Sequence, residues 1–326
     1  MRAEVTAYYD FVKPLDQAGY YETRHHQQIL AAIKDAILQG RLIALCGVVG
    51  CGKTMTMRRL RQQLKDENRV IVSKSVSVDK HSIKLGTLIT ALFYDLATDK
   101  HIRIPTQSEK RERDLRDLVK KSKRPVALFI DDAHDLSLQT LIYLKRLGEV
   151  IEDGGGKLSI VLTGHPKLQN DLRRPTMEEI GYRTDVFTWD GIAGSQREYI
   201  AWLLEACTNG KDADSVLTAE AVDMLATKLR TPLQVQQHLA LALETGYRMD
   251  ERPISGRLLE TVLSKQLDDL EPTLARNGYR IKDLVEQFDV KAVEIKALLG
   301  GRLDPKRAGE LQDRMLAAGL PLGEAS

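Results

Sequence analysis

The string GVVGCGKT at Gly47–Thr54 constrains the fold of this chain more than any other segment. It matches the pattern G-x-x-x-x-G-K-[ST] and lies between the apolar run LIALC and the segment TMRRLRQQL, which has the composition of a helix. In a strand, loop and helix of this kind, glycines let backbone N–H groups turn toward phosphate oxygens, and the helix adds the positive end of its dipole. The sequence therefore predicts a P-loop within an α/β domain that binds ATP.

The loop also assigns roles to individual residues. Lys53 is expected to reach the β- and γ-phosphates, and Thr54 is expected to ligate Mg²⁺. ATP and Mg²⁺ are thus the expected cofactors. The residues expected around the nucleotide are Gly47, Val48, Val49, Gly50, Cys51, Gly52, Lys53, Thr54 and Met55.

An acidic pair supplies the second half of such a site. In VALFIDDAHDL an apolar run precedes Asp131, which is expected to hold Mg²⁺ through water, and Asp132, which is expected to orient or activate the attacking water. Taken alone, two aspartates after a strand more often form a helix cap or turn, but the upstream loop favours the catalytic interpretation. The run LSIVLTGHP contains Thr163, whose hydroxyl is expected to bond the γ-phosphate or the water, with a functionless strand-end hydroxyl as the alternative.

Hydrophobic periodicity divides the chain into four parts. Residues 1–40 are predicted to be a lead-in segment with one helical face, packed on the ATPase core. Residues 41–190 alternate short apolar runs with amphipathic stretches, which predicts a parallel sheet flanked by helices, with strands near 42–46, 70–78, 126–130, 158–163 and 186–187. Residues 191–250 show only helical spacing and predict a small helical lid. Residues 251–326 are predicted to be a helical extension, broken at Gly300-Gly301.

Composition limits the remaining possibilities. Among 326 residues, 48 Lys and Arg nearly balance 46 Asp and Glu, so the net charge of +2 gives no global attraction to a polyanion. Three cysteines are too few for a disulfide framework, which fits a reducing cytoplasm. The sequence lacks the long apolar run of a membrane span, so we expect a cytoplasmic protein without a membrane partner.

Over residues 41–250 the chain resembles the AAA+ ATPases, and within them the group that holds the transposition regulators TnsC, IstB and MuB and the secretion-associated ExeA ATPases. GVVGCGKT resembles Walker A, LFIDDAHDL resembles Walker B, VLTGHPKL resembles the sensor-1 strand, and EEIGYRTDVF resembles the segment with the arginine finger. The resemblance implies an AAA+ parallel sheet followed by a helical lid. It also implies that Arg183 acts on the nucleotide of a neighbouring subunit, with Arg173 and Arg174 as alternatives.

Two positions depart from the family pattern. Asp132 takes the place of the usual Glu, and its carboxylate is one methylene shorter, which predicts slow ATP hydrolysis. Because Arg183 would complete the site of a neighbouring subunit, the resemblance also implies that hydrolysis depends on assembly. In the lid, LRTPLQVQQHL resembles the sensor-2 helix, yet Leu233 and Gln234 stand where an Arg is usual. Arg230 is the candidate substitute.

By the same resemblance, two segments are expected to contact DNA phosphates without sequence preference. SVSVDKHSIKLG contributes Lys80 and Lys84, and IPTQSEKRER contributes Thr106 and Lys110. The alternative for the second segment is a solvated helix of alternating charge, because acidic residues are interleaved with the basic ones.

The resulting hypothesis is an ATP-dependent DNA-binding regulator of transposition. Such a protein would form a homo-oligomer, as a ring or helical filament, select duplex target DNA and recruit a transposase. The C-terminal extension would dock a partner or a neighbouring subunit, or would only pack on the lid. A secretion ATPase of the ExeA kind and a nucleotide-gated signalling switch without DNA binding are the alternatives.

Overall fold

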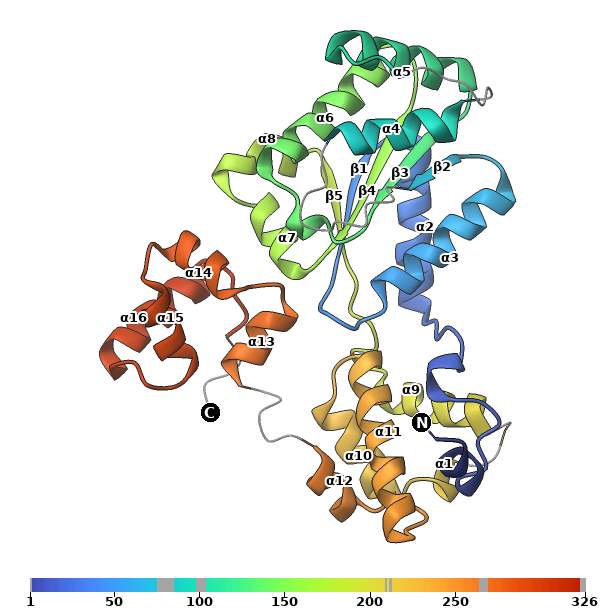
Figure 1. Ribbon diagram of the computed structural model, residues 1–326, viewed down its shortest axis with the longest axis vertical. Coiled ribbons are helices and arrows are strands. Elements are labelled where there is room, and N and C mark those ends of the chain that lie inside the picture. The colour runs from blue at the N-terminus through green and yellow to red at the C-terminus, as the bar shows by residue number, and fades with distance from the viewer. Residues whose placement is uncertain are drawn as a thin grey trace. The chain divides into compact units, whose positions relative to one another are not determined.

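The computed structural model describes residues 2–74, 85–97, 104–208, 210, 213–263 and 269–322. The chain forms two compact units (Figure 1). The first, here the α/β unit, comprises Thr23–Gly47 and Lys53–Trp189. The second, here the helical unit, comprises Met1–Glu22, Val48–Gly52 and Asp190–Ser326.

A parallel sheet forms the centre of the α/β unit, and its strand order is β2-β3-β4-β1-β5. Every residue of β3 and β4 is buried, as expected for parallel strands covered by helices on both faces. The predicted parallel α/β sheet is therefore confirmed, and the expected strand 186–187 extends over five residues. The strands are β1 (Leu42–Cys46), β2 (Ile71–Lys74), β3 (Val126–Ile130), β4 (Leu158–Gly164) and β5 (Thr184–Thr188).

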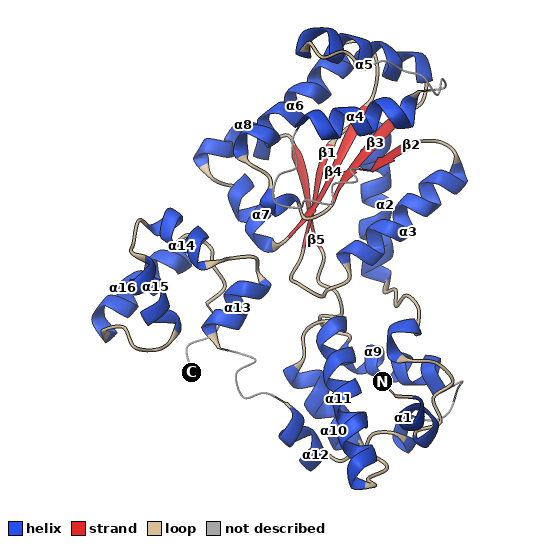
Figure 2. Cartoon of the chain, viewed as in Figure 1, coloured by secondary structure: helices blue, strands red, loops and turns tan. Residues whose placement is uncertain are grey.

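Helices flank this sheet (Figure 2). The first of them begins after Thr23, whose hydroxyl accepts a hydrogen bond from the His26 N–H, and ends at Gly40 in a left-handed conformation. Its apolar face, Ile29, Ile33, Ala36 and Ile37, is buried as the periodicity predicts. The helices are α2 (Arg24–Gln39), α3 (Lys53–Glu67), α4 (Leu85–Leu96), α5 (Ser108–Ser122), α6 (Leu138–Asp153), α7 (Pro166–Leu172) and α8 (Glu178–Gly181), with 3₁₀ turns η2 (Ala133–Asp135) and η3 (Pro175–Met177).

The helical unit contains the segment expected as a lid, together with the N-terminus. One core joins residues 5–18 to residues 192–263. Tyr9 lies within it, and its hydroxyl donates to the Glu251 carbonyl at 2.9 Å. Elements are α1 (Ala3–Tyr8), η1 (Leu15–Gln17), α9 (Gln196–Thr208), η4 (Ala213–Ser215), α10 (Ala219–Lys228), α11 (Pro232–Met249) and α12 (Gly256–Val262).

The structure divides the expected lead-in segment at Thr23. Helix α2 packs on the sheet, whereas residues 1–22 belong to the helical unit. The reason is aromatic packing: Tyr8 meets Tyr247 edge-to-face, with ring centroids 5.4 Å apart, and Tyr21 meets Tyr199 in the same way at 5.3 Å.

The C-terminal helices have a core of their own. They are α13 (Leu270–Arg276), α14 (Ile281–Phe288), α15 (Ala292–Leu299) and α16 (Pro305–Ala317). Their buried side chains form a cluster separate from that of the lid. Helix α15 ends at the predicted break, with Gly300 as its cap and Gly301 at a φ of 64°. In the described part of the chain, no helix combines the length and the apolarity needed to span a membrane.

Candidate nucleotide-binding site

The P-loop follows β1, which lies between β4 and β5 in the sheet, as its sequence predicts. Gly50 and Gly52 have φ angles of 80° and 102°, a region that favours glycine. A Cβ on Gly50 would lie 2.7 Å from the Leu233 Cβ and 3.1 Å from the Thr231 hydroxyl, so the loop has no room for a larger residue there. Helix α3 begins directly after the loop, at Lys53. The loop backbone therefore fits a phosphate cradle at a helix N-terminus.

Lys53 is held inside this turn. Only 8% of its surface is exposed, which is rare for lysine, and its Nζ donates to the Gly47 carbonyl at 2.6 Å. The ammonium thus lies against the first residue of the loop, and its contact with phosphate oxygens stays a prediction.

Asp131 is the centre of the polar contacts at the carboxyl edge of the sheet. Its Oδ2 accepts from the Thr54 hydroxyl at 3.1 Å. Its Oδ1 accepts from the Thr163 hydroxyl at 2.5 Å and from the Asp132 N–H at 3.1 Å. Donors from α3, from β4 and from the carboxylate's own loop therefore fix its orientation.

This donor set fits a magnesium ion. The Thr54 hydroxyl and the Asp131 carboxylate are hard oxygen ligands already in contact, and Mg²⁺ usually takes few protein ligands and completes its shell with water and phosphate. No cluster of three or more His, Cys, Asp or Glu residues suited to a metal occurs among the described residues. A magnesium ion here would therefore depend on the nucleotide as well as on Thr54 and Asp131.

Asp132 and Thr163 differ in their burial and contacts. Asp132 is half-buried at the start of η2 with a φ of 55°, a left-handed conformation that aspartate tolerates. The Thr163 hydroxyl is buried and donates to Asp131, so the structure shows it positioning that carboxylate. Contact of either residue with the γ-phosphate or the attacking water stays a prediction.

A pair of histidines at this edge was missed by the sequence analysis. The rings of His134 and His165 lie with centroids 3.9 Å apart. Burial, helped by the charges of His134 and Lys53, lowers the pKa of His165 to about 4, so its ring is neutral at pH 7. The segments DDAHD and TGHP each place a histidine just after a strand, but only the pairing of β3 with β4 brings the two rings together, and the sequence does not reveal that pairing.

Arg183 lies at the opposite edge of the sheet. It precedes Thr184, the first residue of β5, which pairs with Leu42 at the start of β1. Five residues of strand, about 16 Å, separate it from the carboxyl edge. Its side chain is 60% exposed and forms an ion pair with Glu149. Arg183 thus cannot act on the nucleotide of its own α/β unit.

The alternative arginines and the lid residues are also located. Arg173 is exposed, and Arg174 bonds Asp171 at 2.9 Å. Gln234 is used within α11, where its Oε1 accepts from the backbone N–H groups of Arg230 and Thr231. The Leu233 N–H donates to the Gly50 carbonyl at 3.3 Å, and the exposed Arg230 lies just before the helix.

The expected DNA contacts divide into two sets. Lys80 and Lys84 lie outside the described residues. Thr106 and Lys110 are both exposed: Lys110 lies in the first turn of α5, and Thr106 precedes Gln107, the residue that caps the helix.

Fold and site together define the class of this chain: it has a P-loop AAA+ fold followed by helical units. Residues 37–172 match the family described as "AAA domain". Part of the chain is 28% identical to General secretion pathway protein A of Aeromonas hydrophila over 164 residues. That match covers 50% of this chain and only 29% of the relative, so the chain spans less than a third of its length.

Solved structures support the fold. The structure of Cdc6p from Pyrobaculum aerophilum matches 93% of this chain and 89% of its own chain, with a TM-score of 0.54 at 16% identity. The structure of the Aeropyrum pernix ORC2 protein matches with a TM-score of 0.53 at 15% identity, and the match covers 96% of this chain and 85% of that chain. A chain from the structure of Drosophila ORC bound to DNA matches with a TM-score of 0.54 at 15% identity, and the match covers 97% of this chain and 84% of that chain.

Proposed function

We propose that this protein is an oligomeric, ATP-dependent DNA-binding ATPase that regulates DNA transposition by selecting target DNA and recruiting a transposase. One observation carries the ATPase part of the proposal. The carboxylate of Asp131 is held by Thr54 and Thr163 at the P-loop edge, while Arg183 is exposed at the other edge. One chain therefore offers a phosphate site on one side and an arginine for a neighbour's site on the other.

The reaction is transfer of the γ-phosphoryl group of ATP to water, giving ADP and phosphate. Lys53 and the loop N–H groups bind the β- and γ-phosphates, and Asp132 accepts the proton of the attacking water. Thr163 keeps the Asp131 carboxylate oriented. Bound Mg²⁺ supplies neutralisation of phosphate charge. Because Asp132 is a short carboxylate, turnover is slow.

The position of Arg183 supports the assembly part of the proposal. An arginine that acts across an interface requires a head-to-tail contact, which generates rings or helical filaments. The ion pair of Arg183 with Glu149 is on the surface, so it exchanges for a phosphate at little cost.

The DNA and transposase parts rest on the resemblance to transposition regulators. Support comes from Thr106 and Lys110, which are exposed and suited to phosphate contacts. We propose that these residues, with Lys80 and Lys84, bind duplex DNA without sequence preference once arrayed in the oligomer.

Mixing two inactive variants tests the shared site. The Lys53→Ala variant cannot bind nucleotide but still offers Arg183 to a neighbouring subunit. The Arg183→Ala variant binds nucleotide but offers no arginine to its neighbour. We expect each alone to release little phosphate from ATP, and an equal mixture to recover about a quarter of parental activity, because about one interface in four pairs the two intact halves. Recovery to no more than the mean of the two variants contradicts a shared site.

Electron microscopy of the protein with ATP and duplex DNA tests the rest. We expect ATP-dependent rings or filaments on unrelated duplexes, with binding that weakens as salt rises. A monomeric protein under these conditions contradicts the proposal.

The second candidate is a secretion-associated ATPase, which the likeness to General secretion pathway protein A favours. In that case ATP drives assembly, but neither duplex DNA nor salt affects the hydrolysis rate.

A further inference from the structure

Helices α14 and α15 form a compact motif near the C-terminus. Each has eight residues, and they are joined by Asp289, Val290 and Lys291 alone. Asp289 adopts a left-handed conformation with a φ of 50°, which reverses the chain in so short a turn. Two short helices with a three-residue turn are the arrangement of a helix-turn-helix.

The core of the motif leaves one side of α15 uncovered. Leu284 and Phe288 of α14, Val290 of the turn, and Ile295 and Leu298 of α15 are all buried together. Helix α16 completes this core with apolar residues of its own. Since these contacts use the inner face of α15, its opposite face meets solvent.

That outer face carries small, apolar and basic side chains. Ala292, Val293 and Lys296 are exposed, and their spacing of three and four residues places them on one side of the helix. Val293 is 78% exposed, the largest value among the exposed large hydrophobic residues of the helices in this motif. An exposed valine beside lysine suits the major groove, where thymine methyl groups lie near acceptors of guanine.

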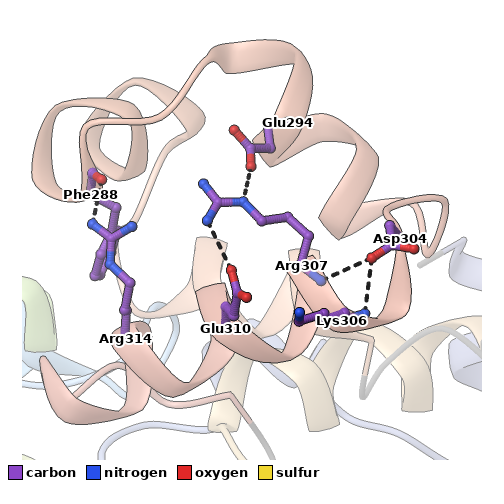
Figure 3. A network of polar contacts seen from close by, with 7 residues as sticks. All are labelled: Phe288, Glu294, Asp304, Lys306, Arg307, Glu310 and Arg314. Atoms are coloured by element: carbon purple, nitrogen blue, oxygen red, sulfur yellow. Dashed lines mark hydrogen bonds and ion pairs between the residues drawn. The ribbon is translucent and has the colours of Figure 1, made fainter.

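Helix α16 supplies an arginine that pairs with the acidic residue of α15 (Figure 3). The Nε of Arg307 donates to Glu294, the acidic residue of α15, at 2.5 Å, and its Nη1 donates to Glu310 at 3.2 Å. Asp304 is engaged as the N-cap of α16, where it accepts from two backbone N–H groups. Arg314 donates to the Phe288 carbonyl at 2.6 Å and so fastens α16 to the end of α14.

The cations around α15, in contrast, are available. Lys291, Lys296, Arg302 and Lys306 are exposed, and none forms an ion pair with another residue in the described part of the chain. Four cations without ion pairs beside an exposed helix whose Glu294 is paired are complementary to a DNA backbone.

We propose that α14–α16 is a DNA-reading helix-turn-helix in which α15 enters the major groove of duplex DNA. Val293 and Lys296 face base edges there, and Arg302 and Lys306 contact phosphates. This binding site is separate from the nucleotide site and, unlike the proposed oligomer contacts, discriminates between sequences.

The test uses the full chain in buffer without nucleotide. A pool of duplexes with a randomised central segment is selected on the protein, and the enriched duplex and a scrambled control are then titrated by fluorescence anisotropy at several salt concentrations. We expect an enriched sequence motif. Lys296→Ala weakens binding to the enriched duplex by about fivefold or more. It also reduces the difference in affinity between the enriched and the scrambled duplex. Arg302→Ala weakens binding to both duplexes by the same factor. It also lowers the slope of log affinity against log salt concentration by about one.

Lys282→Ala is the matched control. Lys282 is an exposed lysine of α14 but pairs with Glu286, so its loss changes affinity less than twofold. Val293→Glu places a negative charge in the groove and weakens binding at least tenfold, while equal melting temperatures of all variants verify folding. Absence of an enriched motif, or equal effects of Lys296→Ala and Lys282→Ala, overturns the inference.

The experiment also separates this inference from the proposed function. The enriched duplex binds Lys53→Ala as tightly as the parent, because no nucleotide is required. Loss of ATP-driven assembly on DNA with the motif retained refutes the proposed function alone. If Val293→Glu leaves DNA binding unchanged but abolishes self-association, the surface binds protein and the inference is wrong.

Discussion

Thr163→Val isolates the hydrogen bond that orients Asp131. Thr163 is 2% exposed, and its hydroxyl donates to the Asp131 Oδ1 at 2.5 Å. Valine has nearly the same shape, so the substitution removes the donor and leaves no cavity. The same oxygen still accepts the Asp132 N–H, so it is not left unsatisfied.

These contacts determine how much free energy the substitution removes. A hydrogen bond to a charged group contributes about 1.5–3 kcal/mol, and the retained N–H places the loss near the lower end, at about 1.5 kcal/mol. If the bond serves to hold the carboxylate for Mg²⁺, this loss weakens Mg²⁺-dependent ATP binding about tenfold. Nucleotide binding without Mg²⁺ depends on Lys53 and the loop, and it is unchanged.

The assay is titration with a fluorescent ATP analogue in Mg²⁺ and again in EDTA. Thr163→Ser, which keeps the hydroxyl, is the control and binds like the parent. Equal affinity of Thr163→Val and the parent in Mg²⁺ refutes the reasoning. A loss of the same size in EDTA refutes it as well, because the effect then acts through the loop and not through the carboxylate.

Further expectations concern the same edge of the sheet. Lys53→Ala is expected to lose ATP binding in the same titration while its circular dichroism stays parental, because the substitution removes the charge proposed to bind phosphate and leaves the apolar core intact. Asp131→Asn weakens Mg²⁺-dependent binding, whereas Asp132→Asn binds ATP normally and releases phosphate slowly; identical phenotypes contradict the division of roles. The pKa of His165 is about 4 when folded and about 6.5 when unfolded, so protons favour the unfolded state below pH 6.5. Stability therefore falls between pH 6.5 and 4, by about 1–2 kcal/mol for this partly solvated ring. Urea unfolding at pH 7 and at pH 4.5 measures this effect. The free energy of unfolding should fall less between the two pH values in His165→Gln than in the parent.

The sheet and the phosphate loop could be predicted because their signals are local. The loop motif is contiguous, and β1, β3 and β4 are buried on both faces, which gives uninterrupted apolar runs. Strand β5 was seen only in part because it is an edge strand with alternating burial. Its half-buried Asp185 bonds Arg41 at 3.1 Å and interrupts the apolar pattern.

Features that depend on strand order were not predictable. His134 and His165 meet only because β3 and β4 are neighbours, and the sequence gives no order of strands. The turn between α14 and α15 was hidden for another reason: Asp289 adopts the left-handed conformation where a glycine would have marked the helix end. The helical extension was therefore predicted, but its division into a helix-turn-helix was not.

The two edges of the sheet differ in how firmly they hold their functional groups. At the carboxyl edge, Asp131 accepts from three donors and Lys53 is buried, so these groups are fixed before any ligand arrives. At the other edge, Arg183 is exposed and its partner Glu149 is also partly exposed, and such a surface pair contributes only about 0–1 kcal/mol. A phosphate from a neighbouring copy would replace Glu149 at little cost. Preorganised binding on one side and an exchangeable arginine on the other are what an ATPase needs if nucleotide is to bind to single chains but react only after assembly.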